Sequence, residues 1–111
     1  MLRDTKAKDK RYGRARRLFR LAAKHAPEDA EPVYEVAAAY DREEKLPSAR
    51  KWYQKVLEIE AAHPMTLYRL GLLEFDEGKD KRAKELLERF LETKPKGKLV
   101  RMAQKVLKRI K

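Results

Sequence analysis

Apolar side chains recur along the chain at helical spacing, and the pattern itself repeats about every 34 residues. Within residues 47–60 the apolar positions follow the i, i+3, i+4, i+7, i+8 rule of an amphipathic helix. The same spacing predicts further helices over residues 13–26, 31–43, 65–77, 81–93 and 98–110. Between two of these helices, we expect Gly78 to form a left-handed C-cap and Asp80 to serve as an N-cap.

The 34-residue period relates small residues to small residues and bulky residues to bulky ones. The small set is Ala15, Ala49 and Ala83, and the bulky set that follows it is Phe19, Tyr53 and Leu87. Further sets in register are Leu18, Trp52 and Leu86, then Ala22, Val56 and Phe90, then Ala23, Leu57 and Leu91. A period of this length indicates a solenoid in which each unit is a helical pair that must pack against the next. The small residues let the helices approach closely.

The repeated unit resembles the tetratricopeptide repeat, whose pattern reads W-x₂-L-G-x₂-Y…A-x₃-F…P. One unit matches at Leu67-x₂-Leu70-Gly71, Ala83-x₃-Leu87 and Pro95, and another at Val33-x₂-Val36-Ala37-x₂-Tyr40 and Ala49-x₃-Tyr53. Ala15-x₃-Phe19 and Pro27 match the second helix of an earlier unit. The departures are Glu74 for the aromatic residue, Ala61 for the proline, and Val33 and Leu67 for the tryptophan. These replacements keep either the size of the side chain or the helical propensity of the position.

The resemblance implies an all-α fold, a right-handed α-α superhelix of stacked helical hairpins with about two and a half units and a C-terminal capping helix. We expect a single domain over residues 1–111: a basic remnant of a first helix over 1–11 that includes Leu2, repeats over 12–95, and an amphipathic cap over 96–111. The apolar stripe of the cap is Leu99, Met102, Ala103, Val106, Leu107 and Ile110. A cap is favoured over a membrane-surface helix because the last repeat needs a cover. The uncovered N-terminal helix face invites a missing segment or self-association with a second copy.

The family resemblance further implies a non-enzymatic scaffold that binds a peptide or partner protein on a concave face, formed mainly by the first helix of each pair. The groove positions carried over to this chain are Glu31, Tyr34, Glu35, Ala38, Asp41 and Arg42 in one unit, and Met65, Tyr68, Arg69, Leu72, Phe75 and Asp76 in the next. A family clamp for C-terminal carboxylates is not expected, because Glu35 and Ala38 replace its Asn or Lys and only Arg69 could serve. The apolar row on the last unit predicts a groove for an apolar or amphipathic segment, unless the C-terminal helix covers it.

The charge distribution supports one alternative function, binding of nucleic acid or another anionic surface. The net charge of +11 gathers at the ends: residues 1–20 hold nine Lys and Arg against two acids, and residues 94–111 hold eight and no acid. The first patch includes Arg14, Arg16, Arg17 and Arg20. Aromatic residues do not interleave with these cations as single-strand platforms require, so solvated faces that keep a solenoid soluble are the preferred interpretation.

The remaining features argue against an enzyme and against a cofactor or metal site. The chain lacks cysteine, a signal-like apolar start and any apolar run that could span a membrane, so we expect a soluble, cytoplasmic protein. His25 and His63 are interpreted as surface or loop residues, and the pairs Glu43-Glu44 and Asp76-Glu77 as solvated acids. Abundant Lys, Arg and Glu with no Asn resembles proteins from hot environments, an interpretation that a melting temperature near about 50 °C would remove.

Overall fold

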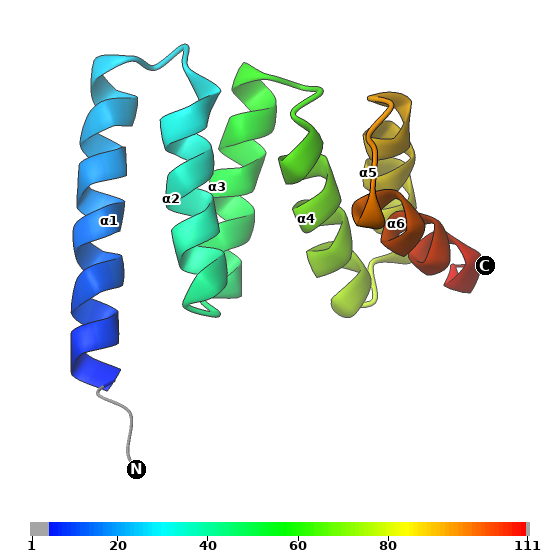
Figure 1. The fold of residues 1–111 in the computed structure, drawn as a ribbon, viewed down its shortest axis with the longest axis horizontal. Helices are drawn as coiled ribbons and strands as arrows, with labels where there is room; N and C mark the ends of the chain where they lie inside the picture. The colour runs from blue at the N-terminus through cyan, green and yellow to red at the C-terminus, as the bar shows by residue number, and fades with distance from the viewer. Residues whose placement is uncertain (1–4, 111) are drawn as a thin grey trace. The chain divides into compact units, whose positions relative to one another are not determined.

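The computed structural model describes residues 5–110, with side chains from Tyr12 onward, and over this range the chain forms helices and no strand. The helices are α1 (Thr5–His25), α2 (Ala30–Arg42), α3 (Leu46–Ile59), α4 (Pro64–Asp76), α5 (Asp80–Glu92) and α6 (Lys98–Arg109) (Figure 1). The all-α prediction is confirmed. The bounds of α2 to α6 lie within one residue of the ranges predicted from the apolar spacing.

The first helix is the exception, because α1 begins at Thr5 and not near residue 13. Residues 5–11 are therefore part of α1 and not the remnant of a separate helix; Leu2 lies outside the described residues. No proline interrupts residues 5–25, and Lys, Arg and Ala are good helix formers. Gly13 costs such a helix only about 1 kcal/mol, which is too little to end it.

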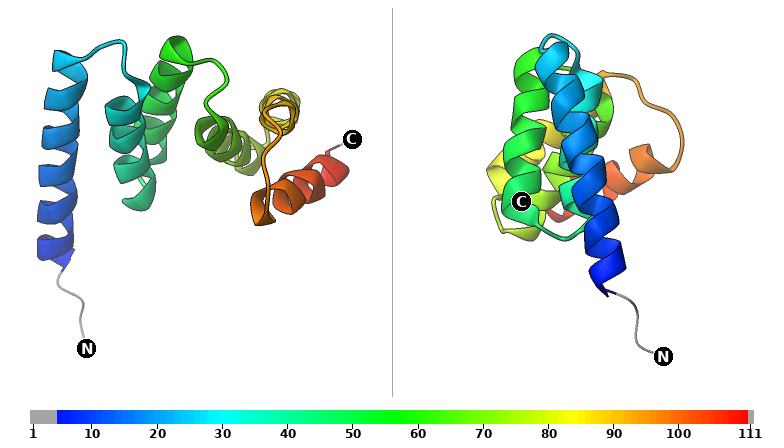
Figure 2. Two further views of the ribbon diagram at one scale, coloured as in Figure 1. Left: turned by 45° about the horizontal axis from the view of Figure 1, so that its top comes forward. Right: turned by 90° about the vertical axis from the view of Figure 1, so that its left-hand side faces the viewer.

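By their internal contacts the residues form two compact units, Met1–Ile59 and Glu60–Lys111. In the first unit α2 packs against both α3 and α1, and in the second unit α4 packs against α5 while α6 contacts both (Figures 1 and 2). The pairs α2–α3 and α4–α5 are the helical hairpins that the repeat predicts. A single domain over residues 1–111 stays a prediction.

The turn inside each hairpin repeats at the same interval as the side chains. In the first unit the backbone N–H of Lys45 donates to the carbonyl of Tyr40 at 2.9 Å, and in the second Lys79 donates to Glu74 at 2.9 Å. The residue before each donor is left-handed, Glu44 with φ 62° and Gly78 with φ 79°. The left-handed C-cap predicted at Gly78 is confirmed. This bond pattern closes the helix end and reverses the chain.

The helix starts differ from one another in their capping groups. Asp29 caps α2 by accepting a hydrogen bond from the backbone N–H of Glu31 at 3.0 Å. The predicted N-cap at Asp80 is wrong, because Lys79 occupies the N-cap of α5 and Asp80 is its first helical residue. The left-handed Gly78 reverses the chain within one residue, so Lys79 alone separates it from α5, which begins at Asp80. The carboxylate of Asp80 still lies in the first turn, where a negative charge is favourable.

The core of each unit consists of the residues that the period relates. In the first unit the fully buried positions include Ala37, Ala49, Tyr53 and Val56, and in the second Leu70, Ala83, Leu86, Leu87 and Phe90. Gly71 lies at a close approach between α4 and α5, since a Cβ atom added to it would lie 2.8 Å from Cδ2 of Leu87. Leu87 is itself fully buried and has little room to move.

We expect Gly71→Val to lower the free energy of unfolding by about 1–3 kcal/mol, because the new side chain would overlap Leu87. The cost should fall by at least about half in a Leu87→Ala background, where the space has been opened. Gly13→Val is the matched control: Gly13 is also inside a helix, but a Cβ there meets nothing within 4 Å. Urea denaturation followed by circular dichroism measures the original chain, Gly71→Val, Leu87→Ala, the double variant and Gly13→Val. An equal cost in both backgrounds would show that Leu87 is not the obstacle.

Candidate functional site

The predicted groove residues of the first unit all lie on α2, but two of them are engaged by α3. The ring of Tyr34 lies 6.0 Å from the ring of Tyr53, and the carboxylate of Asp41 accepts a hydrogen bond from the Tyr53 hydroxyl at 2.7 Å. Tyr34 also packs against the buried cluster of Ala30, Val33 and Val56. Both side chains therefore stabilise the hairpin, whatever else they do.

The other predicted positions on α2 differ in their exposure. Ala38 is 9% exposed and offers only a small patch of surface, Glu35 is half-buried, and Arg42 is exposed near the end of the helix. Glu31, at the start of the same helix, is exposed as well. The part of this face that reaches solvent is therefore mostly charged.

The predicted residues of the second unit lie on α4 and leave apolar surface accessible. Met65 is 37% exposed, while Leu72, Phe75 and Arg69 are half-buried. Tyr68 differs from them, because it is 5% exposed and its ring lies 5.2 Å from that of Phe90 on α5. Tyr68 thus belongs to the core of the unit. Met65, Leu72 and Phe75 are spaced i, i+7 and i+10, so they share one side of α4.

The C-terminal helix packs on this same unit. It contacts α5 and α4, with Ala103 fully buried and Leu99, Val106, Leu107 and Ile110 half-buried. Met102 was expected in this stripe but is 45% exposed, so the prediction is wrong at this position. Met102 precedes the buried Ala103 by one residue. Because one residue corresponds to a turn of about 100° around the helix, the two side chains cannot both lie at the centre of the packed side.

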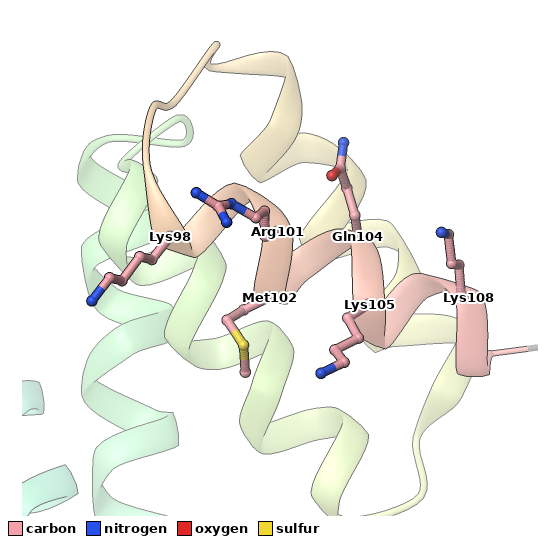
Figure 3. A pocket seen from close by; sticks show the side chains of 6 residues that line it. All are labelled: Lys98, Arg101, Met102, Gln104, Lys105 and Lys108. Carbon is pink, nitrogen blue, oxygen red and sulfur yellow. The ribbon is translucent and has the colours of Figure 1, made fainter.

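A pocket of about 600 Å³ borders the exposed side of α6. Its lining is formed by Lys98, Arg101, Met102, Gln104, Lys105 and Lys108. Figure 3 shows Met102 and Lys105 extending to the same side of the helix. The lysines that line the pocket can contribute aliphatic stems to it while their ammonium groups remain in water. The pocket thus combines a small apolar floor with a strongly positive rim.

Sequence reasoning missed a stack of cations on aromatic rings in the first unit. The guanidinium of Arg16 lies 4.6 Å from the centroid of the Tyr40 ring, and that of Arg20 lies 5.4 Å from the Trp52 ring. The Lys55 ammonium also contacts Trp52 and lies 4.5 Å from the centroid of its ring. Arg20 also donates a hydrogen bond to the Tyr40 hydroxyl. Arg16 and Arg20 are therefore held within the unit and are not part of a freely solvated basic cluster.

The interpretation of Glu43 as a solvated acid is wrong. Its side chain is 3% exposed and forms an ion pair with Arg16, and its other carboxylate oxygen lies 3.5 Å from the Lys45 ammonium. Glu43 follows the last residue of α2, so its carboxylate faces α1 and ties the two helices together. The pair predicted at Asp76-Glu77 is exposed, as expected.

His63 is likewise not a surface histidine. It is 6% exposed and forms the N-cap of α4, where Nδ1 accepts a hydrogen bond from the backbone N–H of Thr66 at 3.3 Å. Nδ1 also lies 2.9 Å from the Thr66 hydroxyl oxygen. His63 therefore caps α4. The sequence did not indicate this role because N-caps are usually Ser, Thr, Asp or Asn. His25 is exposed, as expected.

The described residues contain no group of three or more His, Cys, Asp or Glu side chains placed to hold a metal ion. Within residues 5–110, no helix has both the length and the apolar character needed to cross a membrane. The positions that reach solvent on α2, α4 and α6 carry charged, aromatic and aliphatic side chains. Such surfaces fit the binding of another macromolecule.

Comparison with solved structures finds a similar chain in the crystal structure of the Sgt2 TPR domain from Aspergillus fumigatus. The two chains are 25% identical and superpose with a TM-score of 0.76 over 91% of this chain and 68% of that chain. No protein-family model and no curated protein matches the sequence.

The resemblance to the tetratricopeptide repeat family is confirmed by this structural match, and the chain has a TPR-like fold. A fold of this kind supports, in general terms, a protein–protein interaction scaffold. The surfaces that bind a partner in this chain are a separate matter, since function depends on a site and not on a fold alone.

We expect Glu43→Gln to lower the free energy of unfolding by about 2–4 kcal/mol, because the change leaves the largely buried Arg16 without its counter-charge. The matched control is Glu77→Gln, which removes an acid from the exposed ion pair with Lys79 at 3.7 Å. Exposed pairs contribute little, so its effect should stay within about 0.5 kcal/mol. Thermal and urea denaturation compare the two. Equal effects would contradict the structural role of Glu43.

Proposed function

We propose that this chain is a non-enzymatic scaffold that binds a peptide or amphipathic segment of a partner protein on the first-helix faces of its repeat units. The binding residues are then Tyr34, Glu35, Ala38, Asp41 and Arg42 on α2, and Met65, Tyr68, Arg69, Leu72 and Phe75 on α4. The observation that carries the proposal is the accessible apolar side of α4, with Met65 37% exposed and Leu72 and Phe75 half-buried.

The spacing of these three side chains suits an amphipathic segment. Anchors at i, i+7 and i+10 extend over about 15 Å of helix, which is the length that three turns of a bound helix would cover. Arg69 lies on the same helix and is half-buried, so it could pair with an acid of the partner next to the apolar row. Tyr68 lies between Met65 and Leu72 in the helical spacing. Its ring contacts the ring of Phe90, so Tyr68 serves as a positioning residue for the apolar side of α4.

The charged face of α2 would then contribute selectivity more than affinity. Exposed charges guide the approach of a partner and disfavour partners of the wrong sign, while apolar anchors contribute most of the binding free energy. Arg42 and Glu35 offer one charge of each sign on this face. Tyr34 and Asp41 are expected to act through the hairpin contacts with Tyr53 that hold α2 in place.

The alternative, binding of nucleic acid or another anionic surface, is supported by the positive rim of the α6 pocket. It is weakened at the N-terminal patch, where Arg16 and Arg20 already contact Glu43, Tyr40 and Trp52. The two functions differ in their response to salt. Binding through phosphate contacts falls steeply as salt rises, whereas binding to an apolar row changes little.

We expect peptides selected from a random 16-residue phage-displayed library on the immobilised full chain to carry apolar anchors at helical spacing. Their affinity, measured with synthetic copies by fluorescence anisotropy, should fall by at least about tenfold in Met65→Glu and in Leu72→Glu. The exposed Lys84→Glu on α5 is the control and should change affinity by less than about twofold. Selected peptides that bind both α4 variants as tightly as the original chain would refute the proposal.

A further inference from the structure

One side of α1 exposes two leucines between cations. Leu18 is 67% exposed and Leu21 is 54% exposed, the largest exposures among the bulky apolar side chains that the structure describes. Arg14, Arg17 and Lys24 are also exposed and share that side, because the five positions follow the spacing i, i+3, i+4, i+7 and i+10. We name these five residues the outer face of α1. In Figures 1 and 2, α1 lies beside α2 with no further helix of its unit on the opposite side.

The repeat shows what kind of element covers an equivalent face. Leu18 corresponds to Leu86 on α5, which is fully buried in a hairpin whose other helix is α4. Ala15 and Phe19 correspond in the same way to Ala83 and Leu87, both fully buried, yet Ala15 and Phe19 are only half-buried. Helix α1 thus carries the side-chain pattern of a second helix, but none of the described residues forms its first helix.

The cations of α1 divide into two groups according to the side on which they lie. Arg16 and Arg20 contact Glu43, Tyr40 and Trp52 of the same unit. Arg14, Arg17 and Lys24 of the outer face form no ion pair with any described residue. The outer face therefore combines apolar surface that a helix can cover with three positive charges that acidic side chains can neutralise.

We propose that the outer face of α1 binds an acidic amphipathic helix of a partner protein, which pairs with α1 as α4 pairs with α5. The apolar side of the partner helix covers Leu18 and Leu21 and extends toward Ala15 and Phe19. Its flanking Asp or Glu side chains pair with Arg14, Arg17 and Lys24. This surface is separate from the α2 and α4 faces of the proposed function.

The hairpins of this chain indicate what the partner helix needs. Where α4 lies close to Leu87 of α5 it has a glycine, Gly71, and the matching position in α2 is Ala37, which is fully buried. The partner helix should therefore carry a glycine or alanine between larger apolar residues, with acids on either side. Its pattern would be that of residues 33–40, Val33-x₂-Val36-Ala37-x₂-Tyr40, in which the small residue follows the second apolar anchor.

A second copy of the chain is a poorer occupant on grounds of charge. The other exposed bulky side chain on a basic helix is Met102 of α6, and Lys98, Arg101 and Lys105 line the same pocket. Bringing that surface onto Arg14 and Arg17 would place cations against cations. Like charges at a contact oppose association, and this penalty is largest at low salt.

The probe is a blocked peptide of residues 29–44, which is the α2 segment of this chain. It contains six acids and one arginine, and it carries the apolar and small residues of a first helix. We expect the full chain to bind the labelled peptide in fluorescence anisotropy, with an affinity that falls as salt rises. The control peptide Val36→Glu is more acidic but has a broken apolar stripe, and it should bind at least about tenfold more weakly.

The protein variants separate apolar pairing from simple charge attraction. Leu18→Lys adds a positive charge, so attraction alone would strengthen binding, whereas helix pairing predicts a loss of at least about tenfold. Arg17→Glu should also weaken binding. The matched control Met102→Lys, at the exposed apolar position of α6, should alter affinity by less than about twofold. Melting temperatures close to that of the original chain would show that the variants remain folded.

Several results would overturn the proposal. They are a failure of the original chain to bind the peptide, equal or tighter binding by Leu18→Lys, and an equal loss in Met102→Lys. Light scattering that shows a dimer dissociated by Leu18→Lys would assign the face to a second copy. Vesicles of phosphatidylserine and phosphatidylcholine that bind the original chain but not Leu18→Lys would assign it to an anionic membrane surface.

Discussion

The close approach of two helices at a small residue is the contact on which the fold depends. Gly71 leaves no room for a β-carbon beside Leu87, and the matching Ala37 is fully buried in the other hairpin. Because the two helices lie close together there, the bulky side chains on either side are packed and fully buried, as Leu70, Leu86 and Leu87 are. One hairpin buries only part of its apolar surface in this way, so further helices must pack on it, as α1 does on α2 and α6 does on α4 and α5.

The same constraint determines which surfaces remain for partners. Residues that face the other helix of a hairpin are used for packing, and this is why Tyr68 lies under Phe90 and Asp41 accepts a hydrogen bond from Tyr53. Accessible surface with apolar character or with exposed cations remains on the far side of α4 and on the uncovered sides of the terminal helices. On α4 that surface is apolar, and on α1 and α6 it is apolar at the centre and positive around it.

The sequence was sufficient to predict five helices almost to the residue, because the apolar spacing and the left-handed Gly78 are local signals. It was not sufficient where a role depends on residues distant along the chain. Glu43 reads as a solvated acid until α1 places Arg16 beside it, and His63 reads as a loop histidine until the start of α4 brings the backbone N–H of Thr66 to its ring. Met102 fits the apolar stripe of α6 by spacing alone, yet it is exposed because the packed side of that helix is narrower than the stripe. The groove residues came from the family resemblance, and their part in binding stays a prediction.

The central claim is that the 34-residue period reflects hairpins packed through small residues. A nuclear Overhauser spectrum of the full chain tests it most directly, at the contact between the glycine of α4 and the leucine of α5. The account predicts a strong cross-peak between an α-proton of Gly71 and the methyl groups of Leu87, together with cross-peaks between the rings of Tyr68 and Phe90. Well-resolved signals for these residues without those cross-peaks would mean that α4 and α5 do not meet as described, and would contradict the account.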